Sequence, residues 1–217
     1  DLDLNFENFK NSELFASIEK VSNDTFLKIF DTHIQDTDLK PTDFNNLNSE
    51  IKIVLDHENF TFDSGIQIYE NLQKKSSDRY EYVFPYYNFN TSLSDNFLNG
   101  TISLSSGGNN VLNNTNQLKS NITNDIVYYG SDLISNKGLK NNITIDVKNL
   151  NSLGKNNSEY KSSPQIELMS LIDLSTSLPL IKEDQVYKNY LTPKMSLKIN
   201  PSDMKNYTDT DRKINTN

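Results

Sequence analysis

The sequence predicts an all-β protein built as an antiparallel meander, and three observations support this prediction. Apolar and polar residues alternate with a period of two along most of the chain, which gives each strand one apolar and one polar face. β-branched and aromatic residues dominate the alternating runs, as is typical of strands. Turn-forming residues separate the runs, and several strands joined by short turns indicate antiparallel pairing.

Four strands are expected in the N-terminal half of the chain. They are Ser12–Val21, Glu50–Asp56, Asn59–Glu70 and Arg79–Asn90. Their alternating apolar positions are, in order, Leu14, Ala16 and Ile18; Ile51, Ile53 and Leu55; Phe60, Phe62, Ile66 and Ile68; and Tyr80, Tyr82 and Phe84. This spacing puts each set on one side of its strand.

Four more strands are expected in the C-terminal half. They are Thr101–Ser105, Asn142–Lys148, Gln165–Leu174 and Asn189–Asn200. The apolar positions are Ile102 and Leu104 in the first, Ile143, Ile145 and Val147 in the second, and Leu191, Met195, Leu197 and Ile199 in the last.

Chain reversals are expected where turn-forming residues cluster. These places are Ser22–Asp24, Asp56–Asn59, Gly107–Asn110 and Asn136–Gly138, with longer connections at Asp31–Ser49 and Asn149–Pro164. The Asn-rich segments are interpreted as loops. A short helix is the alternative at residues 68–77, where we prefer a strand that ends in a polar turn. No domain boundary stands out, so residues 1–217 are expected to belong to one β domain.

Composition excludes several classes of protein. The formal net charge is -8, which argues against a nucleic-acid groove because phosphate binding needs clustered Lys and Arg. The chain has no Cys, so disulfides, thiolate metal sites and cysteine nucleophiles are absent. No run of 18 apolar residues predicts a transmembrane helix. Because the chain opens without Met and stops in a polar stretch, we expect it to be an internal piece of a longer protein.

No group of residues predicts catalysis, a metal site or a cofactor. His33 and His57 have no second ligand at metal-binding spacing. Asp36–Asp38 and Asp209–Asp211 have the D-x-D spacing of calcium loops, but they lack the Gly and Glu that complete an EF-hand. Gly107-Gly108 lacks a phosphate-binding pattern and is expected to be a hairpin turn. We therefore expect no enzyme.

The alternation leaves two architectures open. A soluble β-sandwich would place the polar face of each strand in water, whereas a transmembrane barrel would turn it to an aqueous lumen and the apolar face to lipid. Tyrosines at strand ends fit the aromatic girdles of membrane barrels and equally fit ordinary cross-strand pairs. Pro85 and Pro193 lie inside expected strands, where proline marks an edge, a bulge or a strand end, or weakens a seam between strands.

The order of motifs resembles one family, the lipopolysaccharide-assembly protein LptD (organic solvent tolerance protein). The matching segments are Val21–Lys28 (VSNDTFLK), Asp63–Leu72, Arg79–Phe89 with its YVFP, Asn99–Gly107, and Tyr187–Pro201 with its YLTPK. The resemblance spans most of the chain, from Val21 to Pro201. Residues 110–124 depart from the family, because they are Asn-rich where an Arg-rich segment is common. The family's periplasmic jellyroll domain and its first and last barrel strands have no counterpart here.

The resemblance implies an antiparallel segment of a large, incomplete outer-membrane β-barrel in a Gram-negative bacterium. Its implied function is to insert lipopolysaccharide into the outer leaflet, without a cofactor. The implied partners are lipopolysaccharide, outer-membrane lipid, an LptE-like plug lipoprotein and a periplasmic LptA-like bridge reached through the missing N-terminal domain, with no nucleic acid. The family's lateral gate is not assigned to Pro85 or Pro193. The alternatives are a porin-like barrel, a TonB-dependent receptor, or a soluble β-sandwich for binding or adhesion.

Strand parity then assigns the two faces of the expected barrel. The lumen-facing candidates are Lys52, Asp63, Gln67, Thr101, Ser103, Thr144, Asp146, Lys194 and Lys198. The lipid-facing candidates are Ile51, Ile53, Leu55, Ile66, Ile68, Ile102, Leu104, Ile143 and Ile145. A single β-bulge would invert any of these assignments downstream.

Overall fold

The computed structural model describes residues 1–34, 43–75, 78–95, 99–184 and 187–202. The chain divides into two compact units. Unit 1 contains residues 1–89, 106–122 and 151–165, and unit 2 contains residues 90–105, 123–150 and 166–217.

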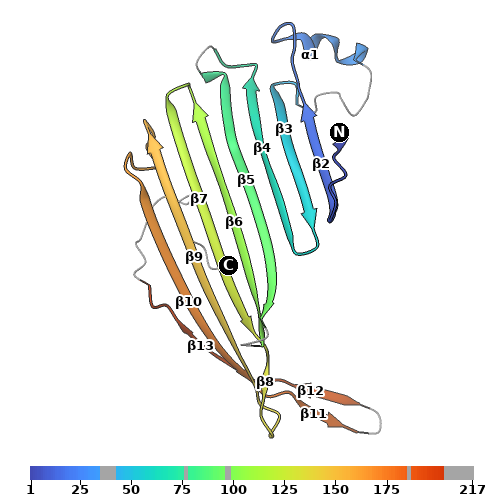
Figure 1. Ribbon diagram of the computed structural model, residues 1–217, viewed down its shortest axis with the longest axis vertical. Coiled ribbons are helices and arrows are strands. Elements are labelled where there is room, and N and C mark those ends of the chain that lie inside the picture. The colour runs from blue at the N-terminus through green and yellow to red at the C-terminus, as the bar shows by residue number, and fades with distance from the viewer. Residues whose placement is uncertain (35–42, 76–77, 96–98, 185–186, 203–217) are drawn as a thin grey trace. The chain divides into compact units, whose positions relative to one another are not determined.

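Among the described residues, eleven strands form one antiparallel sheet that is not closed (Figure 1). The order is β1-β2-β3-β4-β5-β6-β7-β9-β10-β13, with β8 paired to β9, while β11 and β12 form a separate two-stranded sheet. The strands are β1 (Leu2–Asp3), β2 (Phe9–Ser17), β3 (Asn46–His57), β4 (Phe60–Asn71), β5 (Tyr80–Asp95), β6 (Gly100–Asn113), β7 (Gln117–Gly130), β8 (Leu133–Ile134), β9 (Lys140–Lys155), β10 (Gln165–Ser177), β11 (Leu180–Glu183), β12 (Lys188–Leu191) and β13 (Lys194–Ile199). The predicted all-β meander is therefore confirmed.

The hairpin of β3 and β4 is long and regular. Its register runs without interruption from Asn46 opposite Asn71 to Asp56 opposite Thr61, and the two residues Glu58 and Asn59 connect the strands. Gly65 lies in β4 at a close approach. A Cβ atom there would lie 2.6 Å from the Ile51 carbonyl oxygen and 2.9 Å from the Tyr86 hydroxyl oxygen, which leaves no room for a side chain.

A short helical segment interrupts the strands between β2 and β3. It consists of α1 (Phe26–Phe30) and the 3-10 turn η1 (Asp31–His33). Leu27 of α1 is buried against Leu47 and Leu72, with Val21, Phe26, Ile34 and Phe44 packed around them. A five-residue helix has little stability of its own, so this packing holds it in place. The sequence assigned no element to residues 26–30, and η1 lies at the start of the connection expected at Asp31–Ser49.

The turn predicted at Gly107–Asn110 is wrong, because these residues lie inside β6. Gly108 has a packing role instead of a turn role, since a Cβ there would lie 2.7 Å from the Tyr87 ring. The reversal comes later, at Asn114 and Thr115, where φ is 51° and 57°. Asn tolerates this left-handed conformation better than most residues.

The interpretation of the Asn-rich segments as loops is wrong for residues 117–130, which form β7, and for residues 149–155, which belong to β9. It holds at residues 114–116 and 156–164, so the long connection expected at Asn149–Pro164 is shorter. Polar side chains bond across the strands where loops were expected. Ser120 donates to the Asn110 Oδ1 atom at 2.6 Å, and Asn124 donates to the Asn149 Oδ1 atom at 3.1 Å.

The remaining boundaries agree in part with the predictions. Residues 136–138 form the expected turn, with Gly138 at φ 77°. The strand preferred over a helix at residues 68–77 is present, since β4 continues to Asn71. The single strand expected at Asn189–Asn200 is two strands, β12 and β13, which are separated at Pro193. Proline has no N–H for a ladder, which favours a break at this position.

Few described residues are buried. The buried hydrophobic side chains are Leu27, Leu47, Leu72, Val83, Leu150, Tyr160 and Met169. Several large hydrophobic side chains of the described strands are instead exposed, among them Ile51 and Ile66 in unit 1 and Ile166 and Leu168 in unit 2.

Candidate functional site

The register of β3 and β4 sorts their predicted residues onto two opposite faces. Residues opposite each other in a ladder share a face, and alternate residues of one strand do so too. The apolar face carries Ile51, Ile53, Leu55, Ile66 and Ile68. The polar face carries Lys52, Asp63 and Gln67. The eight residues are thus grouped as the sequence alternation groups them, all within unit 1.

The polar face is organised around the Glu50 carboxylate. Its Oε1 atom accepts hydrogen bonds from the Tyr86 hydroxyl and the Gln67 amide, both at 2.7 Å. The Lys52 ammonium lies 3.5 Å from the Oε2 atom. The Glu50 side chain is only 12% exposed, so these bonds to strands β4 and β5 satisfy a largely buried charge.

Further polar contacts extend this network along the same face. Tyr69 donates to the Gln67 Oε1 atom at 3.0 Å, and Asn88 donates to Asp63 at 2.8 Å. The Lys52 ammonium also lies 5.0 Å from the centre of the Phe15 ring, in cation–π contact. The face therefore combines carboxylates, amides and phenol hydroxyls, which can bind hydroxyl-rich or charged ligands and water.

The apolar face is open over its middle. Ile51 is 49% exposed and Ile66 is 41% exposed. Among the described residues of unit 1, the α1 segment covers this face only at the Leu47 end of β3.

An aromatic row borders the apolar face at the other end, beside the β3–β4 turn. The ring of His57 stacks on Phe60 with centroids 4.8 Å apart, and Phe9 and Phe89 contact Phe60 at 5.9 and 5.8 Å. These four residues come from β2, β3, β4 and β5. The aromatic row (Phe9, His57, Phe60 and Phe89) thus runs across the strands rather than along one.

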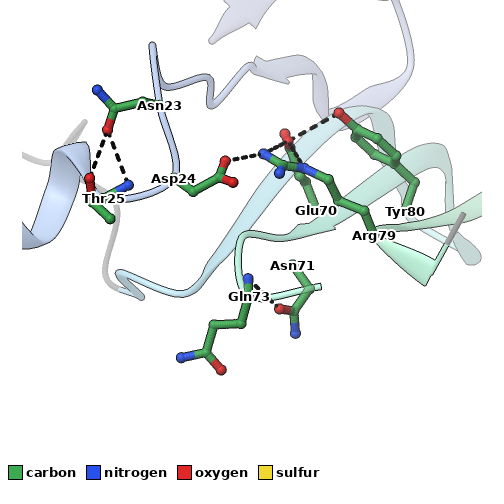
Figure 2. A network of polar contacts seen from close by, with 8 residues as sticks. All are labelled: Asn23, Asp24, Thr25, Glu70, Asn71, Gln73, Arg79 and Tyr80. Atoms are coloured by element: carbon green, nitrogen blue, oxygen red, sulfur yellow. Dashed lines mark hydrogen bonds and ion pairs between the residues drawn. The ribbon is translucent and has the colours of Figure 1, made fainter. Parts of the chain in front are cut away.

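Figure 2 shows a second polar centre, at Arg79 just before β5. The Arg79 guanidinium lies 2.7 Å from Asp24 Oδ1 and 2.6 Å from Glu70 Oε1, and the Tyr80 hydroxyl donates to the same Glu70 oxygen at 3.0 Å (Figure 2). Asp24 lies just before α1, so this contact joins the α1 segment to the end of β4. The Arg79 and Glu70 side chains are 20% and 17% exposed, respectively.

The same contacts affect proton affinity. The hydrogen bond from Arg79 lowers the pKa of Asp24, although slight burial opposes this effect. In return, hydrogen bonds to Asp24 and Glu70 raise the pKa of Arg79. The ion pairs are therefore present throughout the neutral range.

Two tyrosines of β5 bond to glutamates of the neighbouring strands. Tyr80 donates to Glu70 at the end of β4, and Tyr86 donates to Glu50 on the polar face of β3.

The structure places the other predicted face residues in three strands. Thr101, Ile102, Ser103 and Leu104 lie in β6, and Ile143, Thr144, Ile145 and Asp146 lie in β9. Lys194 and Lys198 lie in β13, opposite Ser177 and Asp173 of β10. Their environment, lipid or lumen, stays a prediction.

Several residues of these networks were not singled out by the sequence. Asp24, Arg79 and Tyr86 fall in segments that carry the resemblance, but the sequence assigned no role to them or to Glu50, and Asp24 and Arg79 are far apart in the chain. The pairing of His57 with Phe60 had a signal: a two-residue turn at Glu58 and Asn59 makes them cross-strand neighbours.

The described residues hold no cluster of three or more His, Asp or Glu side chains that could bind a metal ion. The predicted D-x-D segments, Asp36–Asp38 and Asp209–Asp211, lie outside the described residues. No helix in the described ranges is long and apolar enough to cross a membrane. Neither the known protein families nor the curated proteins contain a match to this chain.

Proposed function

We propose that this chain supplies strands to a large outer-membrane β-barrel that inserts lipopolysaccharide into the outer leaflet. One observation carries the membrane part of the proposal. The apolar face of β2–β4 is exposed over its middle, and it is bordered by the aromatic row at one end and by the buried Leu27–Leu47–Leu72 cluster at the other.

The distance between these borders matches a bilayer. Leu47 and His57 are ten residues apart on β3. A strand rises about 3.4 Å per residue, so the span is about 34 Å along the strand. At the tilt of about 40° usual in barrels, this becomes about 26 Å, close to the roughly 25 Å apolar band of outer-membrane barrels.

The polar network supports the aqueous side of the same proposal. With the apolar face in lipid, Glu50, Lys52, Gln67 and Tyr86 would line the lumen, where water satisfies their remaining hydrogen bonds. Such a surface suits the sugars and phosphates of lipopolysaccharide. The substrate, the plug lipoprotein and the periplasmic bridge rest on the motif order shared with the LptD family.

Folding in detergent tests the membrane part. We would record far-UV circular dichroism of the 217-residue chain in buffer and in micelles. We expect β-structure only in micelles, because the apolar face needs an apolar solvent. A cooperative β-fold in plain buffer would contradict the proposal and favour the soluble sandwich.

Photocrosslinking tests the substrate. The chain has no Cys, so single cysteines at Gln67 and Ile66 would carry a benzophenone label on the polar and apolar faces of β4. We expect lipopolysaccharide carrying a labelled sugar core to crosslink at Gln67 in preference to Ile66, and dextran to crosslink weakly. Equal crosslinking of dextran would favour a porin-like channel instead.

A further inference from the structure

Among the described residues, strand β13 forms an edge of the sheet in unit 2. In the described part of the chain its one neighbour in the sheet is β10, with Lys194 opposite Ser177 and Ile199 opposite Ile172. All six residues of β13 are exposed, Met195 and Leu197 to 72% and 57%. Such an edge presents a row of backbone N–H and C=O groups that a further strand can pair with.

The two faces of β13 differ in chemistry. Lys194, Ser196 and Lys198 alternate with Met195, Leu197 and Ile199. On the apolar side, Leu197 lies opposite Leu174 and Ile199 lies opposite Ile172. Strand β13 therefore presents apolar side chains on one face and basic side chains on the other.

Strand β10 satisfies only one of the two lysines with a carboxylate. Asp173 lies opposite Lys198, at 3.8 Å from its ammonium, and accepts a hydrogen bond from Ser196 at 2.8 Å. Lys194 lies opposite Ser177, which has no charge. The basic face thus has a place for a carboxylate on its outer side, beside Lys194.

The lysines disfavour one way of pairing β13 with a second β13. In the antiparallel register that places Met195 opposite Leu197 of the second copy, Lys194 lies opposite Lys198 twice, and like charges directly opposite are destabilising. The register that places Leu197 opposite Leu197 avoids this contact, because Lys198 then lies opposite Ser196, but it leaves both lysines without a carboxylate on the second copy.

We propose that β13 accepts a further antiparallel β-strand that carries a carboxylate opposite Lys194 and apolar side chains opposite Met195 and Leu197. Backbone hydrogen bonds would supply affinity and the alternating side chains would supply selectivity, as in β-strand addition. In the barrel proposed above this would be the neighbouring strand. The argument itself uses only β10 and β13, so it stands apart from the membrane proposal.

Two synthetic hexapeptides test the proposal on the full chain, under the conditions that give β-structure. The acidic peptide reads Val-Glu-Leu-Thr-Leu-Glu and the basic control reads Val-Lys-Leu-Thr-Leu-Lys, each with a fluorophore for anisotropy. We expect the acidic peptide to bind about tenfold more tightly, since two cross-strand charge pairs change sign between them. The double variant Lys194→Glu and Lys198→Glu should exchange this preference.

A cysteine pair tests the place of binding. A Leu197→Cys chain should form a disulfide with the acidic peptide carrying Cys at its third position. A Leu168→Cys chain, whose leucine is 58% exposed on β10, should not form one. The proposal is wrong if both peptides bind equally, if neither binds, or if charge reversal leaves the preference unchanged. In that case the lysines of β13 only discourage pairing with other strands. Detergent-dependent folding can succeed or fail independently of this result.

Discussion

Replacing Ile53 by Arg should destabilise the chain strongly in a lipid bilayer, whereas the same change at the next residue should not. Ile53 lies opposite Ser64 on the apolar face of β3, and Val54 lies opposite Asp63 on the polar face. The two residues are β-branched, apolar and adjacent, so Val54→Arg is a matched control. Its guanidinium would have a carboxylate directly across the ladder.

The expected loss of stability depends on how deep the new arginine would lie in the bilayer. Leu47 and His57 border the apolar band, so its midpoint lies near residue 52, and Ile53 lies about 3 Å from it at about 2.6 Å per tilted residue. Arg at the midplane on the lipid face of a barrel costs about 2–4 kcal/mol, falling to about 0–1 kcal/mol near the interface. We therefore expect about 2–4 kcal/mol for Ile53→Arg and at most about 1 kcal/mol for His57→Arg.

The assay is reversible unfolding by urea or guanidinium in phospholipid bilayers, followed by circular dichroism. Equal costs for Ile53→Arg and Val54→Arg would refute the assignment of the two faces. An equal cost for Ile53→Arg and His57→Arg would refute the lipid argument, because a protein core has no such gradient with depth.

Four other perturbations test the packing of unit 1. Leu47→Ala should lower the free energy of unfolding by about 2–5 kcal/mol in denaturant titrations, because it leaves a cavity under α1. As a control, Ile29→Ala changes a side chain that is 63% exposed and should alter the free energy of unfolding by no more than about 0.5 kcal/mol. Gly65→Ala should cost about 1–3 kcal/mol by the same measurement, because its Cβ would overlap a backbone oxygen; a neutral result would show that the strands can separate there. Arg79→Met should speed proteolysis of the α1 segment without unfolding the sheet, and unchanged proteolysis would contradict a role in fixing the segment. The pKa of Asp24 is lower in the folded chain than in the unfolded chain, where it is about 4. The contribution of Asp24 to stability is therefore complete above the unfolded pKa and is lost as the pH falls through the folded pKa. Acid should therefore speed hydrogen exchange in the α1 segment of the wild type. The same drop in pH should speed exchange less in the Asp24→Asn variant.

The alternation of apolar and polar residues predicted the faces of β3 and β4, because an apolar residue at every second position identifies which side chains share a face. It failed in β7 and in the second half of β9. Asn and Ser side chains bond across the ladder there, so the hydrophobic period that marks a strand is weak. Local pattern also gave no sign of the contact between Asp24 and Arg79, which are 55 residues apart.

The helix was missed for a related reason. Phe26–Phe30 is too short to show a helical period, and it is stabilised by Leu47 and Leu72, which lie after it in the chain.

The strand order has a consequence for how such a sheet can change size. From β1 to β7 each strand lies beside the strands that precede and follow it in the chain. A duplicated or deleted hairpin would therefore add or remove two strands, and only the strands next to the change would meet a new partner. The alternation of inner and outer residues would also survive, because a hairpin restores the direction of the chain. In evolution or in the laboratory, the width of this sheet can thus vary in steps of two strands while the rest of the sequence stays compatible.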